Sequence, residues 1–250
     1  MSRCWVTGAS SGMGAALALR LLEQGHQVAL GGRQADRLAL LAARFAQQAM
    51  LAIGDNDEPG QVAKVAEQIE HAWGALDLVI LNAGTCEYLE PGHFDPALVE
   101  RVMRTNLIGT SHCLAAALPL LRRGKHPHLV VVGSSVSWLA LPRAGAYGAS
   151  KAALRYLVES LRIDLVREGI DVTLVSPGFV DTPLTQRNDF PMPQRWSAER
   201  AAGHIVTRLA KRPLEINFPG AFTWVLRLLG ALPVRWRLQL GQRLARNPRE

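Results

Sequence analysis

Short apolar runs alternate along the chain with longer segments of helical periodicity. The run Leu-Val-Ile-Leu at 78–81 and the run at 129–132 are apolar at every position, which is typical of strands covered by helices on both faces. The pattern predicts an α/β fold, a three-layer doubly wound parallel sheet (Rossmann fold) with about seven strands. The predicted strands lie near residues 3–7, 27–31, 49–53, 77–81, 128–133, 170–175 and 214–217, and the predicted helices include 13–24, 35–47, 96–118 and 148–167.

The domain organisation follows from the length of the chain and from one break in this pattern. A chain of 250 residues with 48% hydrophobic content can bury one sizeable core, so we expect a single Rossmann-type domain over 1–250. Three prolines interrupt residues 182–195, which predicts a loop beyond the carboxyl end of a strand, where open α/β sheets bind ligands. We expect a substrate loop at 184–200 and a basic amphipathic extension at 218–250.

A glycine-rich turn joins the first predicted strand to the first helix. Residues 7–14 read Thr-Gly-Ala-Ser-Ser-Gly-Met-Gly, and glycines at 8, 12 and 14 permit a tight turn and close approach of a pyrophosphate to the helix N-terminus. Such a loop alone is also compatible with a simple turn. Its place after strand one of a βαβ unit favours dinucleotide binding.

The residues after the next strands indicate which dinucleotide is bound. An NAD site would carry an acidic residue after the second strand, whereas this chain has Gly-Gly-Arg at 31–33, so Arg33 predicts a preference for NADP(H). A solvated surface charge is the simpler alternative for Arg33, and Asp36 is better explained as a first-turn helix charge. The Asp55 carboxylate could equally well accept a hydrogen bond from the adenine amino group or cap the helix that follows. Asn82, Ala83 and Gly84 supply small groups next to a ribose.

A tyrosine and a lysine one helical turn apart supply candidate acid–base chemistry. Tyr147 and Lys151 lie on the same helix face, where an ammonium group would lower the pKa of the phenol. Ser134 ends the fifth strand and can hydrogen-bond a substrate oxygen, with Ser135 as its rival. A purely structural role for both serines in a turn is the remaining alternative.

These motifs together resemble the short-chain dehydrogenases/reductases over residues 3–183. The matching segments are 7–14, Asn-Ala-Gly at 82–84, Asn-Leu-Ile-Gly at 106–109, Ser134, Tyr-Gly-Ala-Ser-Lys at 147–151 and Pro-Gly-Phe-Val-Asp-Thr at 177–182.

The resemblance implies a role for each matching residue. Tyr147 exchanges the hydroxyl proton, Lys151 lowers its pKa and holds the nicotinamide ribose, Ser134 orients the carbonyl, and the Asn106 carbonyl holds a relay water. A buried amide satisfied by backbone groups is the alternative for Asn106. The expected catalytic residues are Asn106, Ser134, Tyr147 and Lys151. The expected cofactor contacts are Gly8, Ser10, Ser11, Gly12, Met13, Gly14, Arg33, Asp55, Asn82, Ala83, Gly84, Tyr147, Lys151, Pro177, Gly178, Val180 and Thr182.

Two positions depart from the family pattern. Ser11 stands where many NADP-dependent members carry a basic residue, which leaves Arg33 as the principal cation and puts strict NADP selectivity in doubt. Trp138 stands where small residues are common, so it either narrows or walls the substrate pocket.

Charge and composition limit the partners. The net charge is +7, and the last fifty residues hold nine lysines and arginines against two glutamates. The apolar run before Arg227 is shorter than a bilayer span, so this segment suits an anionic membrane surface, a cover for an apolar substrate, or packing within the protein. No nucleic-acid recognition motif accompanies the charge.

Cys4, Cys86 and Cys113 are too widely spaced to predict a disulfide framework or a metal site, so we expect buried or idle thiols. The N-terminal residues carry no signal-peptide pattern. We therefore expect a cytoplasmic protein, with peripheral contact at a membrane surface as the alternative, and by analogy with the family a homodimer or homotetramer.

Two function classes follow from these patterns. The leading hypothesis is an NADPH-dependent oxidoreductase (class EC 1.1.1.-) that interconverts a carbonyl and an alcohol, with a hydrophobic or lipid-like substrate. The rival is a non-catalytic NADP(H)-binding sensor or scaffold. The set Asn106, Ser134, Tyr147 and Lys151 favours the enzyme, because a binding module has no need of an acidified phenol.

Overall fold

The core of the structure, a computed structural model that describes residues 1–90 and 92–245, is one parallel sheet. Its strands follow the order β3-β2-β1-β4-β5-β6-β9, and every neighbouring pair is parallel. This confirms the predicted doubly wound sheet of about seven strands. The strands are β1 (Arg3–Val6), β2 (Gln27–Gly32), β3 (Ala49–Ile53), β4 (Leu78–Leu81), β5 (His128–Val132), β6 (Asp171–Pro177) and β9 (Glu215–Phe218).

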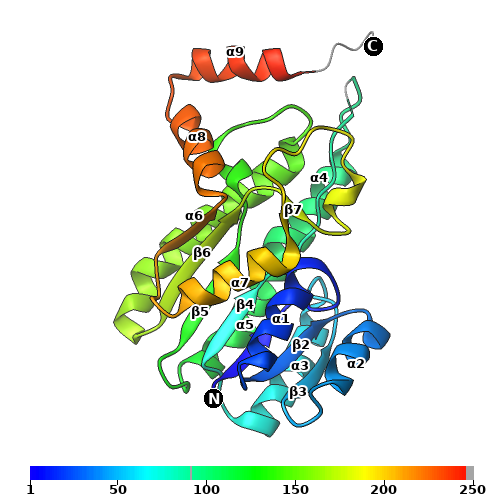
Figure 1. The fold of residues 1–250 in the computed structure, drawn as a ribbon, viewed down its shortest axis with the longest axis vertical. Coiled ribbons are helices and arrows are strands. Elements are labelled where there is room, and N and C mark those ends of the chain that lie inside the picture. Colours follow the sequence, from blue (N-terminus) through cyan, green and yellow to red (C-terminus); the bar gives the residue numbers. More distant parts are fainter. Residues whose placement is uncertain (91, 246–250) are drawn as a thin grey trace.

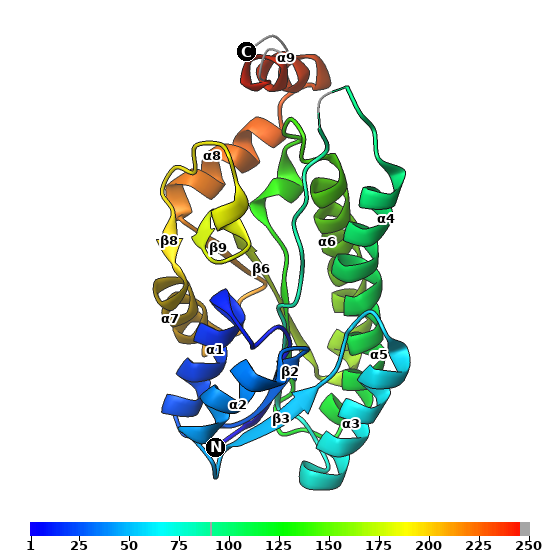
Figure 2. The ribbon, with the colours of Figure 1, turned by 90° about the vertical axis from the view of Figure 1, so that its right-hand side faces the viewer.

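Helices cover both faces of the sheet and complete the three layers (Figures 1 and 2). One face carries α1 (Gly12–Glu23), α2 (Ala35–Ala43) and α7 (Ala198–Leu209). The other carries α3 (Pro59–Trp73), α4 (Pro96–Met103), α5 (Gly109–Leu121) and α6 (Gly145–Leu165). Two helices follow the last strand, namely α8 (Gly220–Gly230) and α9 (Val234–Leu244).

Two apolar cores explain why this arrangement holds. On the first face, Leu17 and Leu21 of α1 and Ile205 of α7 pack on Val6 and Val130. On the second face, Ile69 of α3 and Leu114 of α5 pack on Val79 and other strand residues. Because strand side chains alternate between faces, a fully apolar strand feeds both cores, and the removal of this apolar surface from water stabilises the sheet.

Two predicted segments differ in detail from the structure. The predicted helix at 96–118 is α4 and α5 joined by a π-helical turn, Arg104–Ile108, that contains Asn106. The predicted loop at 182–195 is flanked by a pair of two-residue strands, β7 (Val180–Asp181) and β8 (Trp196–Ser197), which are too short for a periodicity signal.

The strand order reverses beside β1, which lies between β2 and β4. Connections from neighbouring strands leave toward opposite faces at such a point and open a crevice at the carboxyl ends of the strands. The glycine loop after β1 and the Asn-Ala-Gly segment after β4 both meet there.

Candidate functional site

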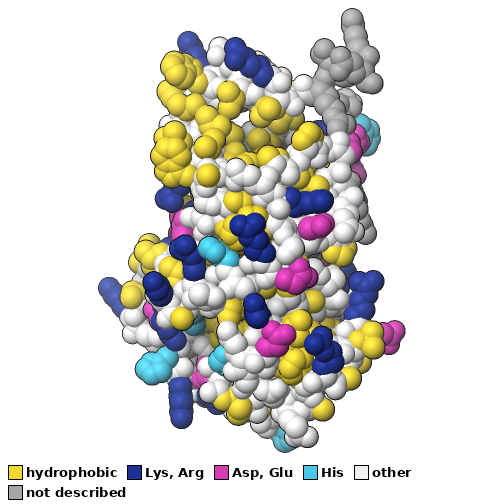
Figure 3. Space-filling view, in the orientation of Figure 1, with side chains coloured by type: hydrophobic (Ala, Val, Ile, Leu, Met, Phe, Trp, Pro, Cys, Tyr) yellow, Lys and Arg dark blue, Asp and Glu magenta, His cyan; other side chains and the backbone are white. Residues whose placement is uncertain are grey.

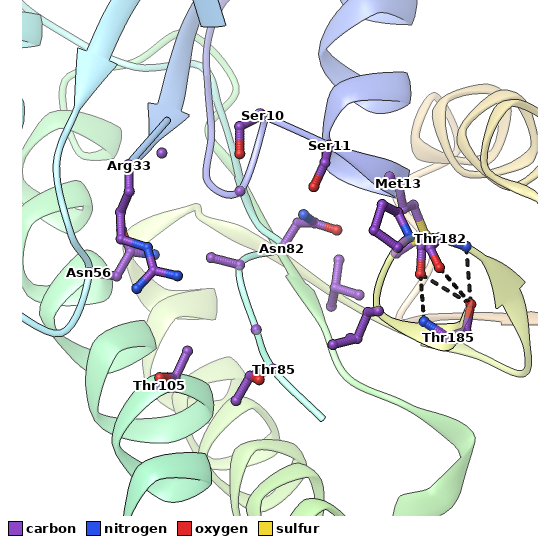
Figure 4. Close-up of a pocket in the computed structure, with 18 of the residues that line it drawn as sticks. Ser10, Ser11, Met13, Arg33, Asn56, Asn82, Thr85, Thr105, Thr182 and Thr185 are labelled. Carbon is purple, nitrogen blue, oxygen red and sulfur yellow. Dashed lines mark hydrogen bonds between the residues drawn. The ribbon is translucent and has the colours of Figure 1, made fainter. Parts of the chain in front are cut away.

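A cavity of about 720 Å³ lies at the carboxyl edge of the sheet (Figure 4). Segments that follow β1, β2, β3, β4 and β6 line it, together with Tyr147 and Lys151 from α6. All the expected site residues line this cavity except Gly14, Asn106 and Ser134, which are buried.

The glycine loop is held in a conformation that larger residues cannot adopt. Gly8 has a φ of +69°, and a Cβ on Gly14 would lie 2.1 Å from the carbonyl oxygen of Gly8. Thr7, which we did not predict as a site residue, stabilises the turn, because its hydroxyl accepts hydrogen bonds from the amides of Asn82 (3.0 Å) and Ala83 (3.1 Å). The N-terminus of α1 therefore faces the cavity without a side chain in the way.

Cationic side chains lie at the β2 end of the cavity. Arg33 is largely exposed and donates to Asp55 at 3.3 Å, and Arg37 from the first turn of α2 lines the same cavity. We did not predict Arg37, because its place in the cavity depends on how α2 leaves the sheet. Figure 4 shows Arg33 and Ser10 at this end of the pocket.

Asp55 is not the helix cap that one interpretation predicted. The residue before α3 is Glu58, whereas Asp55 accepts from the amide of Asp57 at 3.1 Å and from Arg33. The first turn after β3 separates Asp55 from the helix, so its carboxylate lies on the wall of the cavity instead.

Tyr147, Ser134 and Lys151 come together at the other end. The Ser134 hydroxyl donates a hydrogen bond to the Tyr147 phenol oxygen, and the Lys151 ammonium lies 5.9 Å from the centroid of the Tyr147 ring. Lys151 donates to the carbonyl oxygen of Val132 at 3.0 Å. It is thus Ser134, the residue directly after Gly133 at the end of β5, that reaches the phenol.

Burial sets the titration of this pair. Burial raises the pKa of Tyr147 well above its usual value, and the hydrogen bond from Ser134 opposes that rise. Burial lowers the pKa of Lys151 to about 8. The pKa of Tyr147 is therefore raised where the sequence predicted a lowering, because burial of the phenol outweighs the other effects. Nζ of Lys151 donates to Val132 rather than to the phenol oxygen.

Asn106 connects the loop after β4 to α6. Its side-chain oxygen accepts from the amide of Thr85 at 2.7 Å, and its amide nitrogen donates to the Thr85 carbonyl and to Ser150. Ser150, another residue that we did not predict, donates to the carbonyl of Tyr147 at 2.8 Å. The side chain of Asn106 is therefore the satisfied buried amide of the simpler interpretation, and its backbone carbonyl accepts from Thr110 at 2.8 Å.

The segment after β6 closes the cavity over the glycine loop. Thr182 and Thr185 share several hydrogen bonds, among them the Thr182 amide to the Thr185 hydroxyl at 3.0 Å (Figure 4). A Cβ on Gly12 would lie 3.1 Å from the Thr182 side chain. This contact holds the loop of residues 182–185 directly above the start of α1.

An aromatic wall lies beside Tyr147 and comprises Tyr88, Phe179, Phe190 and Phe222. Their ring centroids are 5.3 Å apart for Tyr88 and Phe190, 6.1 Å for Phe179 and Phe190, and 5.6 Å for Phe179 and Phe222. The four rings come from three separate segments of the chain and from α8, so their spacing along the sequence could not predict the wall.

Cys86 belongs to this part of the site, although the sequence favoured an idle thiol. It lies beside Tyr88, and burial raises the pKa of its thiol. Cys4 and Cys113 are buried in the two cores, as expected.

Arg143 joins three loops around the wall. Its guanidinium pairs with Glu90 and Asp189, each at 2.8 Å, and lies 5.8 Å from the Tyr88 ring centroid. Its backbone carbonyl accepts from Leu89 at 2.9 Å. The loops after β4, before α6 and after β7 are thus held together by one side chain.

These features define an α/β protein with a ligand site at the reversal of its strand order. A family model described as short chain dehydrogenase matches residues 3–191. An uncharacterized oxidoreductase of Myxococcus xanthus is 35% identical over 236 residues, 91% of each chain, and one of Staphylococcus epidermidis is 31% identical over 212 residues, 85% of this chain and 92% of that one.

Solved structures agree with these matches. Pseudomonas aeruginosa RhlG, in an active-site complex with NADP, has a TM-score of 0.80 and 28% identity over 89% of this chain and 96% of its own. An alcohol dehydrogenase of Thermococcus sibiricus, complexed with 5-hydroxy-NADP, has a TM-score of 0.78 and 26% identity over 87% and 96%. The chain belongs to the short-chain dehydrogenase family and is an oxidoreductase that acts on alcohol or carbonyl groups.

Proposed function

We propose that this enzyme is an NADPH-dependent reductase of apolar ketones or aldehydes. The observation that carries the proposal is one continuous cavity with Arg33 and Arg37 at one end and the Tyr147–Lys151 pair at the other. The alternative function, an NADP(H)-binding sensor or scaffold, would need the end with the two arginines but not the Tyr147–Lys151 pair.

The cavity fits a nicotinamide dinucleotide. A Cβ on Gly14 would collide with the Gly8 carbonyl, so glycine keeps the loop tight against the start of α1, and the first turn of α1 contains no acidic residue that would repel a pyrophosphate. We assign the pyrophosphate to residues 8–14, the adenosine to Arg33 and Asp55, and the nicotinamide half to residues 82–84, Pro177, Gly178, Val180 and Thr182. RhlG and the Thermococcus dehydrogenase, both with NADP-type ligands, support this assignment.

The residues around Tyr147 then divide the proton chemistry. When bound, NADPH supplies a hydride to the carbonyl carbon of the substrate. The Ser134 hydroxyl orients the carbonyl oxygen and Tyr147 donates a proton to it, so the carbonyl becomes an alcohol and the phenol a phenolate. Lys151 stabilises that phenolate. A proton from solvent can then restore the phenol. Asn106 positions this set through Thr85 and Ser150.

The first test is NADPH oxidation by purified enzyme across aldehydes and ketones of graded size and polarity, with Tyr147→Phe as the variant. Removal of the proton donor is expected to lower kcat by at least about 10²-fold. Binding of NADPH, measured by nicotinamide fluorescence, is expected to change by less than about threefold. Cofactor binding without turnover of any substrate by the wild type would favour the sensor.

The preference for NADPH rests on Arg33 and Arg37. Replacement of both by alanine is expected to raise KM for NADPH by about 10–100-fold and to leave KM for NADH nearly unchanged, because only NADPH carries the 2′-phosphate. Arg44→Ala serves as the matched control, since Arg44 follows α2 and does not line the cavity. Equal losses for the two cofactors would contradict the assignment.

The aromatic wall supports a hydrophobic or lipid-like substrate. It lies beside the phenol, and an apolar substrate would bury its surface against Tyr88, Phe190 and Phe222. The same flank of the molecule is where we place contact with a membrane surface. Faster turnover of short polar carbonyls than of bulky apolar ones would contradict this part of the proposal.

We further propose a cytoplasmic homodimer or homotetramer, to be tested by light scattering. Within residues 1–90 and 92–245, no helix has the length and apolar character needed to cross a bilayer.

A further inference from the structure

The two C-terminal helices present apolar side chains to solvent. On α8, residues 221, 224, 225 and 228 follow helical spacing and are exposed, with Trp224 at 65% and Leu228 at 53%. On α9, Trp236 is 63% exposed, and none of the helix, which lies wholly within the described chain, is buried. Figure 1 shows both helices at the end of the molecule opposite the N-terminus, and Figure 3 shows apolar side chains gathered there.

The charge of this surface is of one sign. Arg227, Arg235, Arg237 and Arg243 are its charged residues, and the sequence holds no aspartate or glutamate from 219 to 245. Helices that carry tryptophan and leucine together with arginine bind in the headgroup region of bilayers, where the apolar groups insert and the cations meet anionic lipid.

The same surface is next to the substrate side of the site. Phe222 of α8 belongs to the aromatic wall, and α8 packs on the turn Ser135–Trp138, with Arg227 over the Trp138 ring at 6.0 Å. One side of α8 therefore forms the wall while its other side faces solvent.

From these observations we propose that the α8–α9 surface docks on an anionic phospholipid bilayer, so that an apolar substrate reaches the aromatic wall directly from the membrane. The choice of substrate rests on the proposed function, whereas the docking does not. A second copy of the chain is a poorer occupant, because a two-fold contact through this surface would bring two sets of four arginines together, and among the described residues the acid that pairs with this set is a single glutamate, Glu215 on Arg227.

The test is flotation of the full-length protein with vesicles of phosphatidylcholine alone or with about a quarter phosphatidylglycerol. Binding is expected to the anionic vesicles, to weaken when salt rises from about 0.05 M to about 0.5 M, and to be much weaker on neutral vesicles. Arg235→Gln with Arg243→Gln is expected to weaken binding roughly fivefold for each arginine. Trp224→Glu is expected to weaken it by about tenfold or more.

Leu40→Glu is the matched control, because Leu40 is 72% exposed on α2, far from α8 and α9, and the change adds the same charge. It is expected to leave vesicle binding unchanged. Turnover of a soluble ketone without vesicles is expected to be equal in the wild type, Trp224→Glu and Leu40→Glu, so loss of docking and loss of enzyme activity are separate results.

Three outcomes would overturn the proposal: no vesicle binding by the wild type, equal loss with Leu40→Glu, or a change of oligomeric state by Trp224→Glu with vesicle binding retained. The last result would assign the surface to a contact between copies.

Discussion

Lys151 carries its charge at a buried position, at the cost of folded-state stability. Its pKa is lowered to about 8 by burial, whereas an exposed lysine titrates near 10.5. The unfolded chain therefore binds more protons than the folded protein between these values, so this group destabilises the fold fully below about pH 8 and ceases to do so above about pH 10.5.

We expect Lys151→Met to be more stable and inactive. Removal of the buried charge should raise the free energy of unfolding by roughly 1–2 kcal/mol at pH 7, less than the pKa shift alone implies because the Val132 carbonyl loses its donor. Urea unfolding at several pH values measures the difference in the free energy of unfolding between the variant and the wild type. This difference should shrink as the pH rises from 8 to 10.5. A variant less stable than the wild type at pH 7 would contradict it.

At the scale of single residues, the sequence could indicate which side chains lie close together but not how they titrate, since the pKa of Tyr147 is raised where a lowering was expected. Tyr147, Lys151 and Ser134 could be chosen because a helical turn and the end of a strand place them. Thr7 and Ser150 could not, because each bonds a distant segment, Thr7 the amides after β4 and Ser150 the Asn106 side chain. Arg37 could not, because its place in the cavity depends on how α2 leaves the sheet.

Among the elements, long periodic segments were predictable and their interruptions were not. The strands β1 to β6 lie within a few residues of their predicted positions, since continuous apolar runs mark buried parallel strands. The π-helical turn at Asn106 carries no sequence signal, because it arises where the Asn106 side chain bonds Thr85 and Ser150 across the fold.

The three loops around the aromatic wall should loosen together when Arg143 is removed. Arg143→Ala breaks the pairs to Glu90 and Asp189, and we expect cleavage by a protease within 184–195 to be about 5–10-fold faster. Global stability should fall by no more than about 1 kcal/mol, since the partner carboxylates are exposed. Arg123→Ala, which breaks a pair with Glu70 far from the wall, is the control and should not change the cleavage rate.

At the scale of the whole molecule, the cavity joins the two halves of the sheet. Segments after β1, β2 and β3 form one side, and segments after β4 and β6 form the other. A ligand that contacts both sides binds the folded chain and not the unfolded one. Its binding must therefore raise the free energy of unfolding of the whole domain.

NADPH at about 100 times its Kd is expected to raise Tm by roughly 5–10 °C, the effect of about 2.7 kcal/mol on a domain of this size. Tyr147→Phe should keep this shift, and the Arg33→Ala/Arg37→Ala variant should lose about half of it or more at the same NADPH concentration. Differential scanning calorimetry measures all three proteins. A missing shift in the wild type would contradict cofactor binding in this cavity.

The strand order also has a consequence for synthesis on the ribosome. β1 pairs with β4 as well as β2, so one edge of β1 has no partner until Leu78–Leu81 emerge. At a translation rate of about 5–20 residues per second, this edge has no strand partner for roughly 4–14 seconds. The apolar residues Cys4, Trp5 and Val6 lie along it. The open edge then passes to β4, β5 and β6 in turn, so a nascent chain presents an unpaired apolar strand until β9 completes the sheet.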